Sequence, residues 1–429
     1  MQPIFKEQIQ MWKDKGYDIP IQEGMYWLDH GIIKAFTLDG ELHNLYKYKV
    51  NDDLTIQITK HKNSKDNKLV FEFWNDTVQR MNDRLDEIEK ESIQFLNSYL
   101  DCGRECIATN STGKDSMVLM TLAQKSKLKV ETYFNVTTLD VAESNLMAKR
   151  LNFHFTYPDL KKYGGFYQWI QRENIIPTRL NRACCQYFKE NATRDSFPAD
   201  KKMLFLFGMR NDESNSRSGY TDIWINNKWG NRDWIGLLPI RKWSDLDIWL
   251  YIFRENIEIN PKYRMGYSRV GCGIACPNYS KSTWVLDKYW YPNLYQRWRD
   301  ILKTDFTINN KWLIMNCTVD EYINKGWNGG VFRPEPTVEV IDEYMEVSGL
   351  NRDVAEKYFN KYCSNGCLNK RHQSRKIKDK ETLAMNMKLF GRNTNKFLCK
   401  KCLMKEYEWN NNDWNTLVED FKCQGCKLF

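Results

Sequence analysis

The chain has 429 residues, of which 42% are hydrophobic and 14% aromatic, so it is long enough to form two or three domains with buried cores. A net charge of +9 favours polyanionic ligands such as nucleotides, but it falls short of the strongly basic range that indicates nucleic acid alone. No apolar run approaches the roughly 18 residues of a membrane span, and residues 1–16 lack the apolar core of a signal peptide. We therefore expect a cytoplasmic protein without membrane contact, whose thirteen cysteines serve metal binding or catalysis rather than disulfides.

The first part of the chain, residues 1–74, is expected to form a small β-rich region. Its short segments at 25–28 and 54–58 alternate in polarity and are bounded by turn residues. Residues 75–100 are polar, with apolar positions at helical spacing, which predicts a helix. This helix leads into a strand expected at 104–109.

Residues 110–116, Asn-Ser-Thr-Gly-Lys-Asp-Ser, are the most informative stretch. They lie between the apolar runs 105–108 and 117–120, which predicts a strand, a tight polar loop and then a helix. Such a loop directs backbone N–H groups and a helix N-terminus at one point, which suits a pyrophosphate. The spacing is not that of the P-loop, Gly-x-x-x-x-Gly-Lys-Ser/Thr. The alternative is an ordinary polar turn with a serine N-cap.

Strands and helices alternate after this loop, which predicts an α/β domain over residues 75–280 with a mostly parallel sheet. Residues 281–360 are rich in Trp and Tyr and are expected to form a helical extension, and residues 361–429 a separate Cys-rich tail. The expected strands are 130–135, 153–157 and 203–207, and the expected helices are 141–151 and 243–255, the second starting at Ser244.

Further segments carry a family resemblance. They are 182–189 (Arg-Ala-Cys-Cys-Gln-Tyr-Phe-Lys), 208–217 (Gly-Met-Arg-Asn-Asp-Glu-Ser-Asn-Ser-Arg), 138–144, and 238–277, which ends in Ala-Cys-Pro. With the 110–116 loop, they resemble the phosphoadenosine phosphosulfate (PAPS) reductase family of the PP-loop ATP pyrophosphatase superfamily. The family's loop is Ser-Gly-Gly-x-Asp-Ser, and here Thr112 replaces its first glycine. The resemblance implies an adenine nucleotide alpha-hydrolase-like, Rossmann-like fold, a parallel sheet with helices on both faces.

The same resemblance implies which residues bind the nucleotide and act on it. The implied nucleotide-binding residues are Asn110, Ser111, Thr112, Gly113, Lys114, Asp115, Ser116 and Arg210, and the implied catalytic residues are Lys114, Ser116, Arg210 and Arg217. The two arginines can bring guanidinium groups to a phosphate or sulfate. Among only five histidines no His-centred site stands out. We therefore expect electrostatic stabilisation of a pyrophosphate leaving group, assisted by Mg²⁺ if ATP is the substrate.

Four cysteines, Cys184, Cys185, Cys272 and Cys276, resemble the cluster-binding set of adenylylsulfate (APS) reductases and of Dnd-type DNA phosphorothioation enzymes. The resemblance implies a 4Fe-4S cluster, which soft thiolates suit. Adjacent cysteines cannot easily bind one zinc ion together, but they can bind two irons of a cube. The second pair is Cys-x3-Cys, one residue longer than the reductases' Cys-x2-Cys. The alternative is four buried thiols without a metal.

The tail contains a second cysteine pattern. Cys399-x2-Cys402 and Cys423-x2-Cys426 are separated by twenty residues, a spacing typical of a zinc ribbon. Cys363-x3-Cys367 competes for two of the four places. Loose cysteines on a surface hairpin are the alternative.

We interpret the chain as an ATP-using PP-loop enzyme that cleaves ATP to AMP and pyrophosphate and activates a substrate for sulfur transfer, with DNA or tRNA as the expected acceptor. Dnd-type phosphorothioation sulfurtransferases are the nearest analogy. A cysteine desulfurase as sulfur donor and an oligomeric state are compatible with this interpretation. The first alternative is an APS or PAPS reductase; against it, the sequence lacks the Glu-Cys-Gly-x-His motif of those enzymes. The second is a non-catalytic module that binds nucleotides or nucleic acid.

Overall fold

The computed structural model describes most of the chain, which divides into two compact units. The first comprises residues 1–177 and 182–296, and the second comprises residues 178–181 and 297–429. None of the helices in the described part is long and apolar enough to cross a membrane. The described residues are 1–62, 69–179, 181–213, 217, 219–225, 229–309, 311–327, 335–359, 364–365, 367, 377, 380–391, 394 and 396–424.

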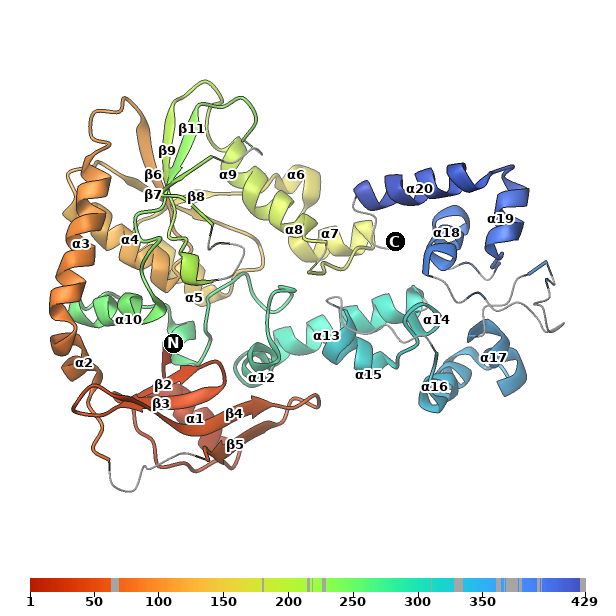
Figure 1. Cartoon of the computed structure of the whole chain (residues 1–429), viewed down its shortest axis with the longest axis horizontal. Coiled ribbons are helices and arrows are strands. Elements are labelled where there is room, and N and C mark those ends of the chain that lie inside the picture. Colours follow the sequence, from red (N-terminus) through yellow and green to blue (C-terminus); the bar gives the residue numbers. More distant parts are fainter. Residues whose placement is uncertain are drawn as a thin grey trace. The chain divides into compact units, whose positions relative to one another are not determined.

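The N-terminal region forms an antiparallel sheet in the order β1-β2-β3-β4-β5 (red in Figure 1), which confirms the expected β-rich region. Its elements are β1 Gln2–Pro3, α1 Lys6–Asp14, β2 Tyr26–Asp29, β3 Ile32–Phe36, β4 Leu42–Val50 and β5 Ile56–Lys60. Trp27 packs against Trp74 with ring centroids 5.8 Å apart, and Trp74 stacks on Phe253 at 4.9 Å. An aromatic core therefore joins this sheet to the α/β domain within the first unit.

The second sheet has six strands in the order β10-β11-β9-β6-β7-β8, all parallel except β10. Its strands are β6 Glu105–Thr109, β7 Glu131–Asn135, β8 His154–Thr156, β9 Met203–Leu206, β10 Ile223–Trp224 and β11 Trp234–Leu237. The chain adds β7 and β8 on one side of β6 and then β9 and β11 on the other, so the order reverses between β6 and β9. Ligands of such sheets bind beyond the carboxyl ends of the strands at this reversal. The expected parallel α/β fold is confirmed, and the 110–116 loop directly follows β6 at the reversal.

Alternate residues of the central strands pack on opposite faces of this sheet. Ala108 and Leu206 share a core with helices α3, α4 and α10, whereas Ile107 and Phe205 pack with Phe197, which follows α9. The helices of this region are α2 Trp74–Arg80, α3 Asn82–Asn97, α4 Lys114–Lys125, α5 Ala142–Arg150, α6 Leu160–Tyr163, α7 Phe166–Glu173, α8 Ala183–Cys185, a π-helix Gln186–Glu190, α9 Asn191–Asp195, a 3₁₀ turn Asn211–Glu213, α10 Asp245–Arg254, α11 Pro261–Arg264 and α12 Lys281–Trp290.

Helix α10 begins at the expected residue. The Ser244 hydroxyl accepts a hydrogen bond from the N–H of Asp247 (3.1 Å), and the Asp247 carboxylate accepts one from the N–H of Ser244 (2.8 Å). This reciprocal pair is a capping box, which fixes where the helix starts. It places Asp245 in the first helical turn.

The described part of the second unit is helical, and this differs from the zinc ribbon predicted for the tail (blue in Figure 1), which would be built on β-hairpins. Asn410 caps α20 by accepting hydrogen bonds from two backbone N–H groups, and Trp414 of α20 packs with Leu398 and Leu403. Local capping and apolar spacing thus favour helices here. The remaining helices are α13 Pro292–Ile308, α14 Lys311–Met315, α15 Val319–Glu321, a π-helix Tyr322–Gly326, α16 Val338–Ser348, α17 Arg352–Phe359, α18 Lys380–Phe390, α19 Lys400–Glu406 and α20 Asn411–Cys423.

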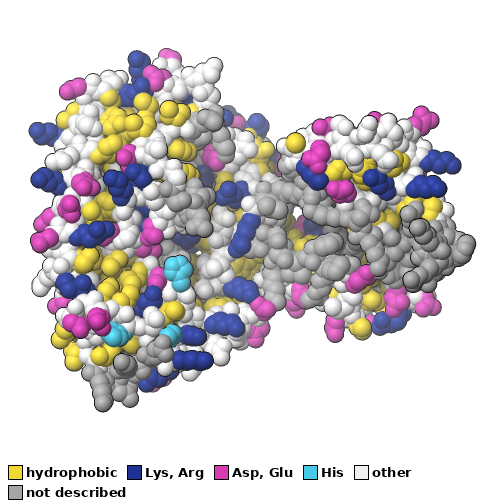
Figure 2. Space-filling view, viewed as in Figure 1, with side chains coloured by type: hydrophobic (Ala, Val, Ile, Leu, Met, Phe, Trp, Pro, Cys, Tyr) yellow, Lys and Arg dark blue, Asp and Glu magenta, His cyan; other side chains and the backbone are white. Residues whose placement is uncertain are grey.

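Charged side chains are interspersed on the visible face of the first unit. Figure 2 shows Lys and Arg side chains alternating with Asp and Glu there, rather than gathering into one large basic patch. On this face the excess positive charge therefore does not form a continuous surface for a polyanion.

Candidate functional site

The loop between β6 and α4 is shaped by its own side chains. The Asn110 amide oxygen accepts a hydrogen bond from the N–H of Thr112 (2.8 Å), and its nitrogen donates to the carbonyl of Ser116 (3.2 Å). Thr112 adopts a left-handed conformation with φ of 58°. A Cβ on Gly113 would lie 3.1 Å from Ser111 Oγ, so the absence of a side chain there keeps the turn tight. Asn110 therefore organises the loop, whereas Ser111 is exposed at its surface.

The start of α4 is fixed by a residue from α11. The N–H of Lys114 donates to Tyr263 Oη over 2.8 Å, and Ser116 Oγ donates to the carbonyl of Gly113 over 2.9 Å. Burial raises the pKa of the Tyr263 hydroxyl, which therefore stays neutral. The sequence predicted no role for Tyr263, because its contact with Lys114 spans 149 positions in the chain.

Lys114 and Arg210 share the same two carboxylates. Lys114 Nζ lies 3.0 Å from Asp115 and 2.9 Å from Asp245. Arg210 donates to Asp115 over 2.6 Å and to Asp245 over 2.5 Å, and its side chain is only 2% exposed. Burial would raise the pKa of Asp245, but the nearby cations, Lys114 first, hold it well below its ordinary value of 3.8. The four residues form a closed ring of ion pairs, and the N-terminal ammonium of Met1 lies 3.1 Å from Asp245 as a further cation.

The loop after β9 packs directly against the start of α4. A Cβ on Gly208 would lie 3.0 Å from the backbone of Asp115, a tighter contact than side chains ordinarily make, so glycine allows the two segments to lie this close. Two positions further on, Arg210 also donates to the carbonyl of Trp243 (3.1 Å), which anchors the guanidinium between the two helices α4 and α10. Because the loop after β9 lies so close to α4, Arg210 reaches the carboxylates of Asp115 and Asp245.

Arg217 lies in the same region but in a different environment. It forms an ion pair with Glu213 and is 33% exposed. Burial lowers its pKa, and repulsion from Arg269 and Arg210 adds to the effect. Arg217 and Arg269 thus bring positive charge to this part of the site without forming part of the ring.

A single cavity of about 1230 Å³ joins these groups within the first unit. Its walls include the loop residues Ser111 and Ser116, the ring of Lys114, Asp115, Arg210 and Asp245, the arginines Arg217 and Arg269, the aromatic side chains of Tyr133, Phe205, Phe207, Trp224 and Trp229, and the residues Asp140 and Lys189. The volume exceeds the roughly 300–1,000 Å³ typical of a small-molecule site. The cavity is lined by both charged and aromatic side chains.

The structure brings the four cysteines of the expected cluster together. Cys184 and Cys185 lie in α8, and Cys272 and Cys276 lie in the loop after α11. Cys184 forms a hydrogen bond with Cys185 and interacts electrostatically with both cysteines of the other pair. A hydrogen bond with Cys276 lowers the pKa of Cys272. The four thiols therefore interact with one another, whereas the side-chain group that the described residues bring close enough to share one metal ion is Cys367, Cys399 and Cys402.

Lys189 links this cysteine site to the cavity. It forms a hydrogen bond with Cys272, and the negative charge of that thiolate raises the pKa of Lys189. Lys189 also lines the cavity that contains the loop. Lys189 therefore contacts the cysteine group and lines the same cavity as the 110–116 loop.

A buried lysine anchors the loop that carries Cys272 and Cys276. Lys262 is fully buried, and its Nζ donates to the carbonyl of Val270 over 2.8 Å. Gly273 has φ of 94°, and a Cβ there would lie 2.5 Å from the carbonyl oxygen of Leu139. Sequence reasoning assigned no role to Lys262 or Gly273, although both lie in the segment that carried the resemblance.

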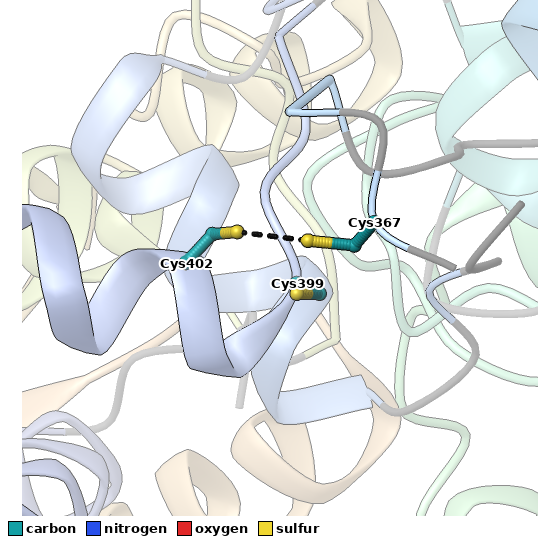
Figure 3. A group of neighbouring side chains, drawn as sticks. All are labelled: Cys367, Cys399 and Cys402. Carbon is teal, nitrogen blue, oxygen red and sulfur yellow. Dashed lines mark hydrogen bonds between the residues drawn. The ribbon is translucent and has the colours of Figure 1, made fainter. Parts of the chain in front are cut away.

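The tail cysteines that lie together in the structure are not the set that their spacing in the sequence predicts. Cys399 and Cys402 lie beside Cys367 (Figure 3), and their Sγ atoms are all within 4.8 Å of one another. Cys423 is exposed and is not part of this group among the described residues. Cys363 and Cys426 lie outside the described residues.

The fold and the loop define a PP-loop α/β domain. Residues 105–278 match the model of the phosphoadenosine phosphosulfate reductase domain. The match covers the loop and the segments that carried the resemblance.

The chain is similar to an uncharacterised protein and to two named enzymes. The chain is 28% identical over 248 residues to an uncharacterised protein of Methanocaldococcus jannaschii, covering 55% of this chain and only 58% of that protein. It is 25% identical over 228 residues to adenosine 5'-phosphosulfate reductase of Anoxybacillus flavithermus, covering 50% and 91%. It is also 25% identical over 200 residues to sulfate adenylyltransferase subunit 2 of Rhodospirillum rubrum, covering 42% and 68%.

Proposed function

We propose that this protein binds ATP at the 110–116 loop, cleaves it between the α and β phosphates, and so activates a substrate for sulfur transfer. The observation that carries the proposal is the single cavity lined both by the loop and by Lys189, which is hydrogen-bonded to Cys272. Nucleotide activation and sulfur chemistry would share one chamber. The names of two relatives, an adenylyltransferase subunit and a sulfonucleotide reductase, are compatible with either half of this chemistry.

Two partly exposed carboxylates favour ATP over APS or PAPS. Asp115 is 20% and Asp245 33% exposed, and both line the cavity. Mg²⁺ is usually held by one or two carboxylates together with nucleotide phosphates, and it would supply charge neutralisation here. Lys114 and Arg210 would then direct their charges to the β and γ phosphates and stabilise the pyrophosphate that leaves.

Arg217 and Arg269 extend the same electrostatic argument. Burial and mutual repulsion lower the pKa of Arg217, so an anion placed beside it stabilises its charged form. Each guanidinium can bind two oxygens of one phosphate. In this proposal Arg217 holds the phosphate groups while Ser116 and the backbone N–H groups at the start of α4 orient them.

The bond changes are those of adenylation followed by displacement. An oxygen of the substrate attacks the α-phosphorus, the bond to the bridging oxygen breaks, and pyrophosphate leaves with the electron pair. The terminal sulfur of a persulfide on a sulfur-donor protein, a cysteine desulfurase being the expected class, then attacks the activated centre, and AMP leaves. A second thiol attacks the resulting disulfide, which releases the thiolated product and leaves a disulfide between that thiol and the donor cysteine. The chain's own contribution in this proposal is charge and position. His30 also lines the cavity, 3.1 Å from Asp29, but its side chain is 94% exposed and it is given no role in these steps.

The residues Cys184, Cys185, Cys272 and Cys276 would hold a 4Fe-4S cluster, which supplies electron transfer or sulfur coordination when bound. Lys189 would neutralise part of the charge of its thiolates. The tail cysteines Cys399 and Cys402 would bind zinc, as their spacing predicted. A cytoplasmic location belongs to the same proposal, because it keeps these thiols reduced.

A nucleic acid, DNA or tRNA, is the proposed acceptor. The cavity is larger than one nucleotide requires, and aromatic side chains of its lining, Trp224 and Trp229 among them, could stack an unpaired base. Dnd-type sulfurtransferases and tRNA-thiolating enzymes are the analogies, and an oligomer would enlarge the surface for such an acceptor. The interspersed charges in Figure 2 favour contact through this cavity rather than through a broad basic face.

An APS or PAPS reductase is the second candidate, favoured by the reductase relative, which this chain covers over 91% of its length. Binding of α,β-methylene-ATP with Mg²⁺, measured by calorimetry against APS and PAPS, distinguishes the two. Our proposal requires the ATP analogue to bind more tightly when Mg²⁺ is present and to bind at least tenfold more weakly to Lys114→Ala. Preference for APS or PAPS, with no effect of Mg²⁺, would favour the reductase. Nucleic-acid binding unaffected by Lys114→Ala, with no nucleotide affinity, would favour a non-catalytic module.

A further inference from the structure

Three cysteines from two separate segments of the second unit converge (Figure 3). Cys367 Sγ lies 3.2 Å from Cys402 Sγ, and Cys399 Sγ lies within 4.8 Å of both. Cys399 is the N-cap residue of α19, and Cys402 lies in its first turn. Residues three apart in a helical turn lie on the same side, so the local geometry directs both thiols toward Cys367.

Backbone pairing holds the two segments together. The N–H of Ser364 donates to the carbonyl of Phe397 over 2.7 Å, and the N–H of Phe397 donates to Ser364 Oγ over 3.1 Å. The side chain of Asn386 in α18 makes two hydrogen bonds to the backbone of Leu398, at 2.7 and 2.8 Å. These hydrogen bonds therefore fix the position of Cys367 beside α19.

We propose that Cys367, Cys399 and Cys402 bind a structural Zn²⁺ ion in the second unit. Zn²⁺ binds thiolates at about 2.3 Å in a tetrahedron, which puts its sulfur ligands about 3.7 Å apart. The three sulfur atoms already lie near this separation. This site involves none of the residues of the proposed nucleotide chemistry.

The surrounding core explains why a metal would be needed. The described buried residues of this cluster are few: Ile377, Met385, Leu398, Cys399, Leu403, Trp414 and Val418. Small cores seldom supply enough hydrophobic stabilisation, and a structural metal is a common supplement. A disulfide between Cys367 and Cys402 would use only two of the three converging thiols, whereas a zinc ion uses all three.

The ligand set differs from the one that spacing predicts. A ribbon would pair Cys399 and Cys402 with Cys423, but Cys423 is exposed at the end of α20 and lies outside the group. Cys367 takes its place. Cys423→Ser is therefore a matched control for Cys367→Ser, because both remove one tail thiol.

The first test counts metals in full-length protein purified anaerobically without added metal. Cys367→Ser is expected to lose about one zinc ion per chain, whereas Cys423→Ser keeps its zinc, and the iron content is the same in both. Zinc unchanged in Cys367→Ser, or wild-type protein without zinc, would overturn the proposal. Loss of zinc in Cys423→Ser but not in Cys367→Ser would restore the ribbon.

The second test uses wild-type protein, so it does not depend on how the variants fold. The protein is labelled with N-ethylmaleimide in the presence and in the absence of a zinc chelator, and the labelled peptides are identified by mass spectrometry. We expect Cys367, Cys399 and Cys402 to react at least about tenfold more slowly than Cys423 until the chelator is added. Protection that the chelator does not change, or a peptide pair linked by a Cys367–Cys402 disulfide, would contradict a zinc site.

Discussion

Lys114 Nζ donates a hydrogen bond to Asp245 Oδ1 over 2.9 Å and so joins the first residue of α4 to the first residue of α10. Arg210 contacts the same Asp245 oxygen at 2.5 Å. The loop that we assign to phosphate binding is therefore electrostatically tied to the helix that starts after β11. This link relates nucleotide binding to the stability of the first unit.

Lys114→Ala should reduce pyrophosphate release from ATP by about 10²–10³-fold, because it removes a positioned cation from the leaving group. Release of pyrophosphate under single-turnover conditions measures this loss. Lys201→Ala is the matched control, since Lys201 pairs with Glu105 at the opposite end of β6 and does not line the cavity. Equal rates for the two variants would remove Lys114 from the proposed chemistry.

Asp245→Asn should lower the free energy of unfolding by about 1–2 kcal/mol near neutral pH. This is less than the loss expected for a fully buried ion pair, because the Asp245 side chain is 33% exposed. Urea unfolding, followed by a spectroscopic signal from the first unit, measures the change. Asp233→Asn, which removes a half-exposed carboxylate paired with Arg104, should change it much less.

The effect of Asp245 on stability should depend on pH in one direction. Its pKa is lower in the folded protein than the ordinary 3.8, so the stabilisation is present above that value and disappears as the pH falls through the folded pKa. The difference between wild type and Asp245→Asn should therefore shrink below about pH 4. A difference that grows on acidification would show that the carboxylate is not stabilised by Lys114 and Arg210.

Tyr263→Phe should weaken ATP binding and cost about 1–3 kcal/mol of stability, because it leaves the buried N–H of Lys114 without its acceptor. Calorimetry of the ATP analogue and urea unfolding measure the two effects. Tyr267→Phe is a useful comparison, since Tyr267 is also buried but bonds to Asp287 instead of the loop. If both variants bind the nucleotide equally well, the Tyr263 hydroxyl does not organise the loop.

Gly273→Ala should lower the iron content of the protein, with only a small loss in the free energy of unfolding. The new Cβ would meet the Leu139 carbonyl at 2.5 Å, and φ of 94° disfavours any side chain, so the loop carrying Cys272 and Cys276 must shift. Iron and sulfide counts on anaerobic protein, with the visible spectrum, measure the loss. Gly219→Ala has no atom within 4 Å of the new Cβ and should keep its iron. Full iron in Gly273→Ala would show that the loop geometry is not needed for a cluster.

Local sequence predicted the elements but not the partners of their side chains. The loop of small polar residues between two apolar runs correctly placed β6 and α4, and Ser244 correctly marked the start of α10, because turns and caps are decided by neighbouring residues. The roles of Asp245 and Tyr263 escaped prediction, because each contacts Lys114 from more than a hundred positions away. Nothing local distinguishes their side chains from ordinary helix residues.

The tail cysteines show the same contrast between what local sequence predicts and what it does not. Two Cys-x2-Cys pairs look equivalent in sequence, but among the described residues Cys399 and Cys402 converge with Cys367, and Cys423 does not join them. The hydrogen bonds between Ser364 and Phe397 that bring Cys367 there depend on chain segments 33 positions apart. Spacing therefore predicted the pair Cys399 and Cys402, and hydrogen bonds between distant segments brought Cys367 to it.

Product analysis tests the central claim most directly. Anaerobically purified protein is incubated with Mg²⁺ and ATP, a sulfide source and total DNA or tRNA, and in parallel with APS or PAPS and a dithiol, and the products are separated by ion chromatography. Our account predicts AMP and pyrophosphate in equal amounts from ATP, lost in Lys114→Ala and retained in Lys201→Ala. Sulfite from APS or PAPS, with no AMP or pyrophosphate from ATP, would contradict it.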